Sequence, residues 1–177
     1  AEREPARRDV AARRQWGLTL GAKDGGPYAS VRVATAWAAS CETWNKNVTA
    51  YLTAQRPAVL IASQTEYGVL SADGPLGATA SARAMADGLR NSYDTLIAAG
   101  TKVLVLRDTP RPGIDVADCV SGNSGHLKRC AFPRSKTLAR VGAEQVTAVD
   151  GLVGASLIDL NDAICPNLVQ SRDGTPA

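Results

Sequence analysis

Short apolar runs alternate with longer segments of helical period along the chain. The four runs read GLTLGA (17–22), AVLIAS (58–63), VLVL (103–106) and ASLIDL (155–160). Each has the length of a strand, and none is long enough to span a membrane as a helix. Strands that alternate with helices are typical of an open parallel sheet with helices on both faces. The pattern therefore predicts an α/β fold of three layers, α/β/α, with a flavodoxin-like parallel sheet.

Apolar residues at helical spacing fill the segments between these runs. The helix before the second strand is predicted from Trp44, Val48, Tyr51 and Leu52. The helix before the third strand is predicted from Met85, Leu89, Tyr93, Leu96 and Ile97. Pro57 prevents continuation of the first helix, and Gly100 is placed to end the second with a positive φ. A weaker helix before the fourth strand is marked by Leu138, Val141 and Val146.

The N-terminal segment is unusual for an α/β domain. Residues 3–15 are predicted to be helical and lead into the first apolar run, whereas such domains usually begin with a strand. We therefore expect a strand to be missing at the start of the fold. Residues 108–134 are predicted to form a long loop region, and such loops are often functional.

Composition and charge exclude several classes of function. At 177 residues the chain fits one domain, residues 1–177, better than two. The formal net charge is only +3, and no aromatic residues interleave with the basic ones, which argues against nucleic acid as a partner. The opening AEREPARRDVAARR is too charged for the core of a signal peptide. We expect a soluble chain that carries no targeting segment of its own.

The four cysteines favour a disulfide over a metal site. They are Cys41, Cys119, Cys130 and Cys165, and His126 is the single histidine. Without a C-x-x-C spacing this set does not favour zinc. Cys119 and Cys130 bracket a short loop, VSGNSGHLKR, which suits a disulfide, although two free thiols are the alternative. A disulfide would place the domain in an oxidising compartment.

Polar residues follow each of the four predicted strands. They are 23–26 after the first strand, 63–67 after the second, 107–109 after the third, and 161–162 after the fourth. Ligands of parallel α/β sheets bind at the carboxyl ends of the strands. These residues are therefore candidates for a site, although loops are commonly polar in any protein.

Several stretches resemble a known family. The specific ones are RDTPRPGIDVADC (107–119), CAFPR (130–134) and LIDLNDAICP (157–166), and the supporting ones are WGLTLGAKDGGP (16–27), ASCETWNKNV (39–48) and RPAVLIASQTEY (56–67). Together they resemble the SGNH hydrolase-like domain that is fused to the membrane acyltransferase-3 proteins of bacteria, which O-acylate cell-surface glycans. The resemblance extends over most of the chain. It implies that the first strand is central in the sheet, so its absence would leave a vacancy between strands 17–22 and 58–63.

The resemblance implies a serine nucleophile in a G-D-S-H turn and a histidine base in a late D-x-x-H-L motif. A serine hydroxyl needs such a base, together with donors aimed at the developing oxyanion. The sequence contains neither motif, and His126 lies inside the Cys119–Cys130 loop, where we interpret it as a solvated loop histidine. Asp173 as the acid of a degenerate motif would put Pro176 at the position of the base, which proline cannot be. We therefore expect a chain trimmed at both ends and inactive by itself.

The resemblance also implies which residues border the acyl-transfer cleft. The candidates for the oxyanion hole or cleft are Asp24, Gly25, Ser63, Gln64, Arg107 and Asp108. The backbone N–H groups near Asp24 and Gly25 are the better oxyanion donors, Gln64 offers a side-chain donor, and Arg107 could pair with Asp108. Alternatively, Arg107 and Asp108 merely brace their loop. The family's cysteine before Pro27 is replaced by Gly26, so Cys41 either pairs with Cys165 or stays free.

The implied function is that of an O-acyltransferase or esterase acting on cell-surface polysaccharide, without cofactor or metal. Its partners would be an acyl donor, the glycan and an integral-membrane acyltransferase domain, at the extracytoplasmic face of the membrane. The first alternative is a catalytically degenerate SGNH-like module that binds glycans. The second is an unrelated flavodoxin-like binding domain with a phosphate-rich ligand near residues 23–26, for which no G-x-G-x-x-G motif is present.

Overall fold

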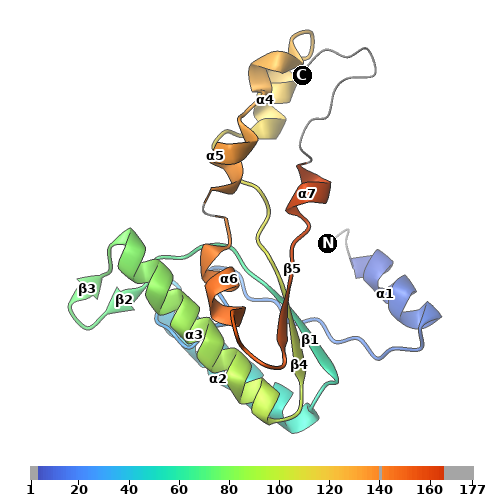
Figure 1. Ribbon diagram of the computed structural model, residues 1–177, viewed down its shortest axis with the longest axis vertical. Helices are drawn as coiled ribbons and strands as arrows, with labels where there is room; N and C mark the ends of the chain where they lie inside the picture. Colours follow the sequence, from blue (N-terminus) through green and yellow to red (C-terminus); the bar gives the residue numbers. More distant parts are fainter. Residues whose placement is uncertain (1–3, 140, 166–177) are drawn as a thin grey trace.

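Figure 1 shows the computed structural model of the chain, which describes residues 4–139 and 141–165. The helices are α1 (Glu4–Arg13), α2 (Ala38–Gln55), α3 (Ala78–Ala98), α4 (Val116–Gly122), α5 (Arg134–Leu138), α6 (Ala143–Val149) and α7 (Asn161–Ile164), with a 3-10 helix η1 (Leu127–Cys130). The strands are β1 (Val59–Ser63), β2 (Leu70–Ser71), β3 (Gly74–Pro75), β4 (Lys102–Leu106) and β5 (Ala155–Ile158). No helix of the described residues is long and apolar enough to cross a membrane. Asp173 and Pro176 lie outside the described residues.

Three parallel strands form the main sheet, in the order β1-β4-β5. Leu60 of β1 lies opposite Val103 of β4, which in turn lies opposite Ala155 of β5. This sheet confirms the predicted α/β class and three of the four predicted strands. The antiparallel hairpin of β2 and β3 was not predicted, because its strands of two residues each are too short to show a period.

Helix α3 packs against one face of the main sheet, with α6 beside it (Figure 1). The largest fully buried side chains of α3 are Met85, Leu89, Tyr93 and Leu96. Met85, Leu89 and Tyr93 belong to the same apolar core as Val103 and Val105 of β4, both of which are 0% exposed. Full burial of a side chain of this size contributes about 1.5–3 kcal/mol relative to exposure. The predicted helical period of this segment is therefore confirmed as the core-facing stripe of α3.

Helix α3 ends in the glycine turn that its sequence predicts. Gly100 has a φ of 96°, which a residue with a Cβ rarely adopts. The N–H of Gly100 donates to the carbonyl of Ile97 (2.9 Å), and the N–H of Thr101 donates to that of Leu96 (3.0 Å). These two bonds form a Schellman motif, which satisfies the last carbonyls of α3 and directs the chain into β4.

The opposite face of the sheet is largely exposed. Side chains alternate along β1, so that Val59 and Ile61 point to this face and are 44% and 66% exposed. By register, Leu104 and Leu106 of β4 share the face and are partly buried. The predicted three-layer fold has a second helical layer, which would cover these side chains. This second layer stays a prediction.

Residues 17–22 do not form the predicted strand. Leu18 and Leu20 are more than half exposed, and no strand of the described residues pairs with this segment. Alternating apolar residues form a strand only where a neighbour satisfies their N–H and C=O groups. The predicted strand 17–22 is therefore wrong, and with it the vacancy between two formed strands. Strand β1 pairs with β4 and has no other strand beside it among the described residues, so no strand fills the place of the missing first strand.

Residues 109–138 form an arm that projects away from the sheet (Figure 1). The predicted long loop here is partly wrong, because it contains α4 and η1. Asp115 caps α4 by accepting a hydrogen bond from the N–H of Asp118 (2.9 Å). The disulfide of Cys119 with Cys130 joins α4 to η1 with a Cα–Cα distance of 5.8 Å, which confirms the predicted pairing. Helix α4 has no buried residues, so no apolar period could reveal it.

The CAFPR motif fastens the arm to the end of the sheet. Arg134, its last residue, donates from Nε to the carbonyl of Cys165 (2.7 Å) and pairs with Asp162 at the start of α7. Because α7 follows β5 directly, this arginine connects the base of the arm to the carboxyl end of the sheet. The remaining cysteines, Cys41 and Cys165, are both free.

Gly26 lies directly against the buried thiol of Cys41. A Cβ added at Gly26 would lie 2.2 Å from Cys41 Sγ and 2.9 Å from Cys41 Cβ. This contact supports the interpretation that the partner cysteine of Cys41 is replaced at position 26. The glycine lets the segment before Pro27 approach α2 closely.

We predict that Gly26→Ala lowers the free energy of unfolding by about 1–3 kcal/mol, because the added methyl group overlaps Cys41 Sγ. Urea denaturation of both proteins measures the difference. Gly125→Ala is the matched control, because a Cβ at Gly125 meets no atom within 4 Å. Equal stability of the two variants would contradict the close contact.

Candidate functional site

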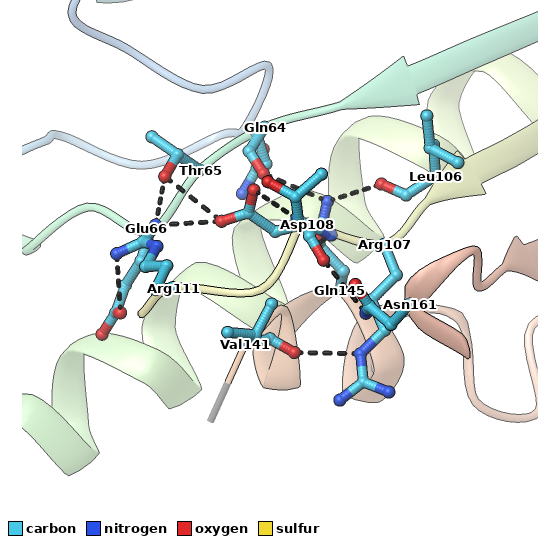
Figure 2. A network of polar contacts seen from close by, with 11 residues as sticks. Gln64, Thr65, Glu66, Leu106, Arg107, Asp108, Arg111, Val141, Gln145 and Asn161 are labelled. Carbon is cyan, nitrogen blue, oxygen red and sulfur yellow. Dashed lines mark hydrogen bonds and ion pairs between the residues drawn. The ribbon is translucent and has the colours of Figure 1, made fainter. Parts of the chain in front are cut away.

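Gln145 connects the ends of β1 and β4 to helix α6. Its side chain is 0% exposed. Nε2 donates to the carbonyl of Leu106 (3.1 Å) and to that of Gln64 (3.4 Å), while Oε1 accepts from the N–H of Asp108 (2.8 Å). One buried amide thus fixes the backbone that follows two neighbouring strands, as Figure 2 shows.

Arg107 connects β4 to the other side of this edge. Its Nε donates to the carbonyl of Val141 (2.9 Å), and one terminal nitrogen contacts Asp159 Oδ2 (2.7 Å). Gly142 makes this approach possible: it has a φ of 63°, and a Cβ there would lie 2.9 Å from Arg107 Cγ. The turn before α6 is therefore held against the end of β4.

Asp159 is the acidic partner of Arg107 after β5. Although burial opposes ionisation, hydrogen bonds from the Asn161 N–H and from Arg107, together with the charge of Arg107, lower the pKa of Asp159. Asn161 also donates from Nδ2 to the carbonyl of Asp108 (3.1 Å). The end of β5 is thereby joined to the loop after β4.

Asp108 forms an ion pair with Arg111, separate from the pair of Arg107 with Asp159. Its Oδ2 accepts from Arg111 (2.9 Å) and from Thr65 Oγ1 (3.2 Å). Arg111 also hydrogen-bonds to Thr65, and its other terminal nitrogen lies 3.5 Å from Glu66 Oε2. The RDTPRPG motif therefore supplies both the aspartate and the arginine that hold residues 65 and 66, as Figure 2 shows.

Arg107 and Asp108 do not form the ion pair that the sequence suggested. Each has a separate partner of opposite charge: Asp159 for Arg107, and Arg111 for Asp108. Neighbouring residues at the end of a strand point in opposite directions, so their charged groups diverge. Both residues brace loops at this edge, and their position at the acyl-transfer cleft stays a prediction.

The loop with Asp24 and Gly25 lies near the same edge. Gly25 has a φ of 77°, and its carbonyl accepts from Thr35 and from the Cys41 thiol at 3.4 Å each. Burial raises the pKa of Tyr67, and the negative charges of Asp24 and Asp108 raise it further. Asp24 and Asp108 therefore both lie near the Tyr67 phenol.

Two buried polar atoms at this edge have no partner among the described residues. They are Gln64 Nε2, a donor, and Asn161 Oδ1, an acceptor. An unpaired buried polar group is costly and needs an explanation, such as a ligand or an ordered water. Gln64 thus has a free donor next to a backbone that Gln145 holds in place.

Three other residues of interest lie apart from this network. Ser63 is on the exposed face of the sheet, and His126 is exposed in the arm, as expected for a loop histidine. Asp162 pairs with Arg134. Among the described residues, no group of three or more His, Cys, Asp or Glu side chains is arranged to hold a metal ion.

Sequence reasoning missed Gln145 and Arg111. A buried glutamine on a short helix has no sequence signature, because its importance comes from carbonyls far away in the chain. Arg111 stood inside the motif that carried the resemblance, and its position three residues after Asp108 was the available signal for an ion pair.

Comparison with known proteins identifies the family. A family model described as "SGNH domain (fused to AT3 domains)" matches residues 4–176. The chain therefore belongs to this family, which confirms the resemblance and ties the chain to acyltransferase proteins.

A solved structure has a similar fold. It is the periplasmic domain of the lipopolysaccharide acetyltransferase of Salmonella ser. Paratyphi A, with a TM-score of 0.60 and 14% sequence identity. The match covers 95% of this chain and 66% of that one, so the chain spans just under two thirds of that domain. The likeness concerns the fold. No curated protein gives a significant match.

We predict that Gln145→Leu destabilises the protein by about 1–3 kcal/mol for each buried group that it leaves without a partner. The N–H of Asp108 and the carbonyl of Leu106 are the groups concerned. Thermal or urea unfolding measures the loss. Gln55→Leu at the exposed end of α2 is the control, with a change within about 0.5 kcal/mol. A loss no larger than that of the control would contradict the linking role of Gln145.

Asp159 predicts a pH dependence of stability. Its pKa is lower in the folded protein than in the unfolded chain, where it is about 3.9. Its contribution is therefore fully present above about pH 4 and is lost as the pH falls through the depressed pKa. Urea denaturation between about pH 6 and pH 3 should show a smaller loss for Asp159→Asn than for the wild type. An unchanged slope, or the same change in the exposed-site control Asp73→Asn, would contradict this prediction.

Proposed function

We propose that the chain is the SGNH domain of a membrane-associated O-acyltransferase or esterase that acts on cell-surface polysaccharide. One observation carries the proposal: the buried, unpaired Nε2 of Gln64 at the carboxyl edge of the sheet. Ligands bind at this edge in parallel α/β proteins. A fixed donor without a protein partner is what the oxyanion of an acyl-transfer reaction requires.

The proposed chemistry is nucleophilic acyl transfer. A serine hydroxyl attacks the carbonyl carbon of an ester while a histidine takes its proton, and the carbonyl oxygen gains negative charge. The Nε2–H of Gln64, with the backbone N–H groups of Asp24 and Gly25, would donate to that oxygen. Collapse of the intermediate expels the alcohol, which regains a proton from the histidine, and the acyl group then passes to a glycan hydroxyl or to water.

The polar network gives this donor a fixed place. Gln145 holds the backbone carbonyl of Gln64, and Arg111 with Asp108 holds the next residue, Thr65. Donors that are already oriented before the reaction lower the barrier more than mobile ones, because no reorganisation is needed. In this proposal, Asp108 and Arg111 are positioning residues.

The serine and histidine of this reaction are proposed to come from the rest of the protein. The printed sequence contains no Gly-Asp-Ser, and its single histidine is exposed in the arm. We treat residues 1–177 as one domain and expect it to hydrolyse no ester by itself. The family's fusion to AT3 domains supports an integral-membrane acyltransferase domain on the same polypeptide as its partner.

An extracytoplasmic location fits the disulfide of the arm. Cys119 and Cys130 are bonded, and disulfides persist in oxidising compartments rather than in the cytosol. The similar Salmonella domain is periplasmic by its description. The proposed site therefore acts on glycans outside the cytoplasm.

A glycan-binding module without turnover is the second candidate function. The observation in its favour is that both catalytic motifs are missing from the printed residues. Such a module would use the same edge of the sheet, but the Gln64 donor would then bind a ligand oxygen without catalysis.

We predict that Gln64→Leu in the full-length protein lowers kcat for hydrolysis of p-nitrophenyl acetate by about 10²–10³-fold, with little change in KM, because an oxyanion donor acts mainly in the transition state. The folded state should lose no stability, since the substitution removes an unpaired buried amide. Gln55→Leu is the matched control and should keep full activity.

Two outcomes would contradict the proposal. Unchanged kcat in the Gln64→Leu protein would remove the amide from the oxyanion hole. Absence of any ester turnover in the full-length wild type, with retained glycan binding, would favour the binding module instead.

A further inference from the structure

A small cavity lies next to the proposed acyl-transfer edge. Its volume is about 220 Å³. Its lining includes Glu66 and Tyr67 after β1, Leu76 after the hairpin, Ala82 and Met85 of α3, and Glu144 of α6. Glu66 and Tyr67 follow Gln64 and Thr65 in sequence, and Arg111 contacts Glu66 at 3.5 Å. The cavity is therefore connected to the network around Asp108 both along the chain and through an ion pair.

Glu144 is the unusual member of this lining. The residue is only 4% exposed, and its Oε1 has no hydrogen-bond partner among the described residues. Burial raises the pKa of Glu144, and the charges of Glu66 and Asp108 raise it further. A hydrogen bond from its own backbone N–H and the charge of Arg111 lower this pKa, but by less. A buried carboxyl oxygen without a partner costs free energy unless a ligand supplies a donor.

The other walls restrict the ligand. Leu76, Ala82 and Met85 form an apolar side, whereas Ser81 already accepts from the N–H of Val69 and donates to the carbonyl of Leu76. The carboxyl groups of Glu66 and Glu144 remain as acceptors. A ligand that fits must offer hydroxyl donors on one side and C–H groups on the other, which is the character of a pyranose ring.

We propose that this cavity is a subsite for one hydroxyl-bearing sugar ring, the acceptor unit of the glycan, with its hydroxyl groups on Glu144 and Glu66. The cavity is smaller than the 300–1,000 Å³ typical of drug-sized ligands, so it takes one ring rather than an oligosaccharide. An ammonium ligand fits less well, because an apolar wall does not solvate its charge. This inference rests on the proposed function, since it places the acceptor beside the oxyanion donor.

The experiment measures binding of methyl glucoside, methyl galactoside and methyl mannoside to the 177-residue chain by NMR titration. We expect at least one glycoside to bind with millimolar affinity, as is usual for a single small ligand. Ala82→Leu fills the cavity and should weaken that binding by about tenfold or more. Ala80→Leu, on the same helix but outside the lining, is the matched control and should change binding by less than about twofold.

A second variant tests the carboxyl group itself. Glu144→Gln keeps the shape of the side chain and should weaken glycoside binding while the far-ultraviolet circular dichroism stays that of the wild type. It also covers the case in which Ala82→Leu does not fold. Cyclohexylammonium is the competing probe, because it has the ring and a cation but no hydroxyl groups.

Three results would overturn the subsite. They are no glycoside binding up to about 100 mM, binding that neither Ala82→Leu nor Glu144→Gln weakens, and tighter binding of cyclohexylammonium than of any glycoside. Gln64→Leu separates the two proposals, because it should lower kcat for ester turnover in the full-length protein and leave glycoside binding intact. Turnover that depends on Gln64 but binding that ignores Ala82 would refute the subsite alone.

Discussion

The buried amide of Gln145 is the interaction on which the carboxyl edge of the sheet depends. Parallel strands end side by side, but nothing in the strand ladder dictates where the following loops go. Gln145 satisfies a carbonyl at the end of β4, the carbonyl of Gln64 after β1 and the N–H of Asp108. Because a buried polar group without a partner is costly, these loops are confined to the one arrangement that serves all three.

The sequence predicted the elements whose stability comes from long periodic patterns. Helix α3 and strand β4 were predicted because four core residues of α3 recur at helical spacing and β4 is a continuous apolar run. The segment 17–22 shows the limit of this reasoning, since its alternation is strand-like but it has no neighbouring strand among the described residues. Strand formation depends on a partner strand from any part of a chain, and a local pattern carries no information about that partner.

The candidate site was predictable in place but not in detail. The rule that ligands bind at the carboxyl ends of strands brought Gln64, Arg107 and Asp108 to one edge, and the structure places them there. Their partners could not be predicted, because Asp159 and Arg111 are chosen by the directions in which successive side chains leave a strand. Separate ion pairs neutralise both charged residues, which leaves an uncharged amide as the group with a free donor.

The unpaired groups of Gln64 at this edge and of Glu144 in the neighbouring cavity have opposite hydrogen-bonding character, which matters for the proposed function. Gln64 offers a donor, whereas Glu144 offers an acceptor in a neighbouring cavity. Acyl transfer to an alcohol makes these two demands, because the carbonyl oxygen accepts and the incoming hydroxyl group donates. Exchange of the two groups would put a carboxylate beside the developing oxyanion, where repulsion would raise the barrier. In the proposed function, the Gln64 donor would therefore serve the acyl carbonyl oxygen and the Glu144 acceptor the hydroxyl group of the alcohol.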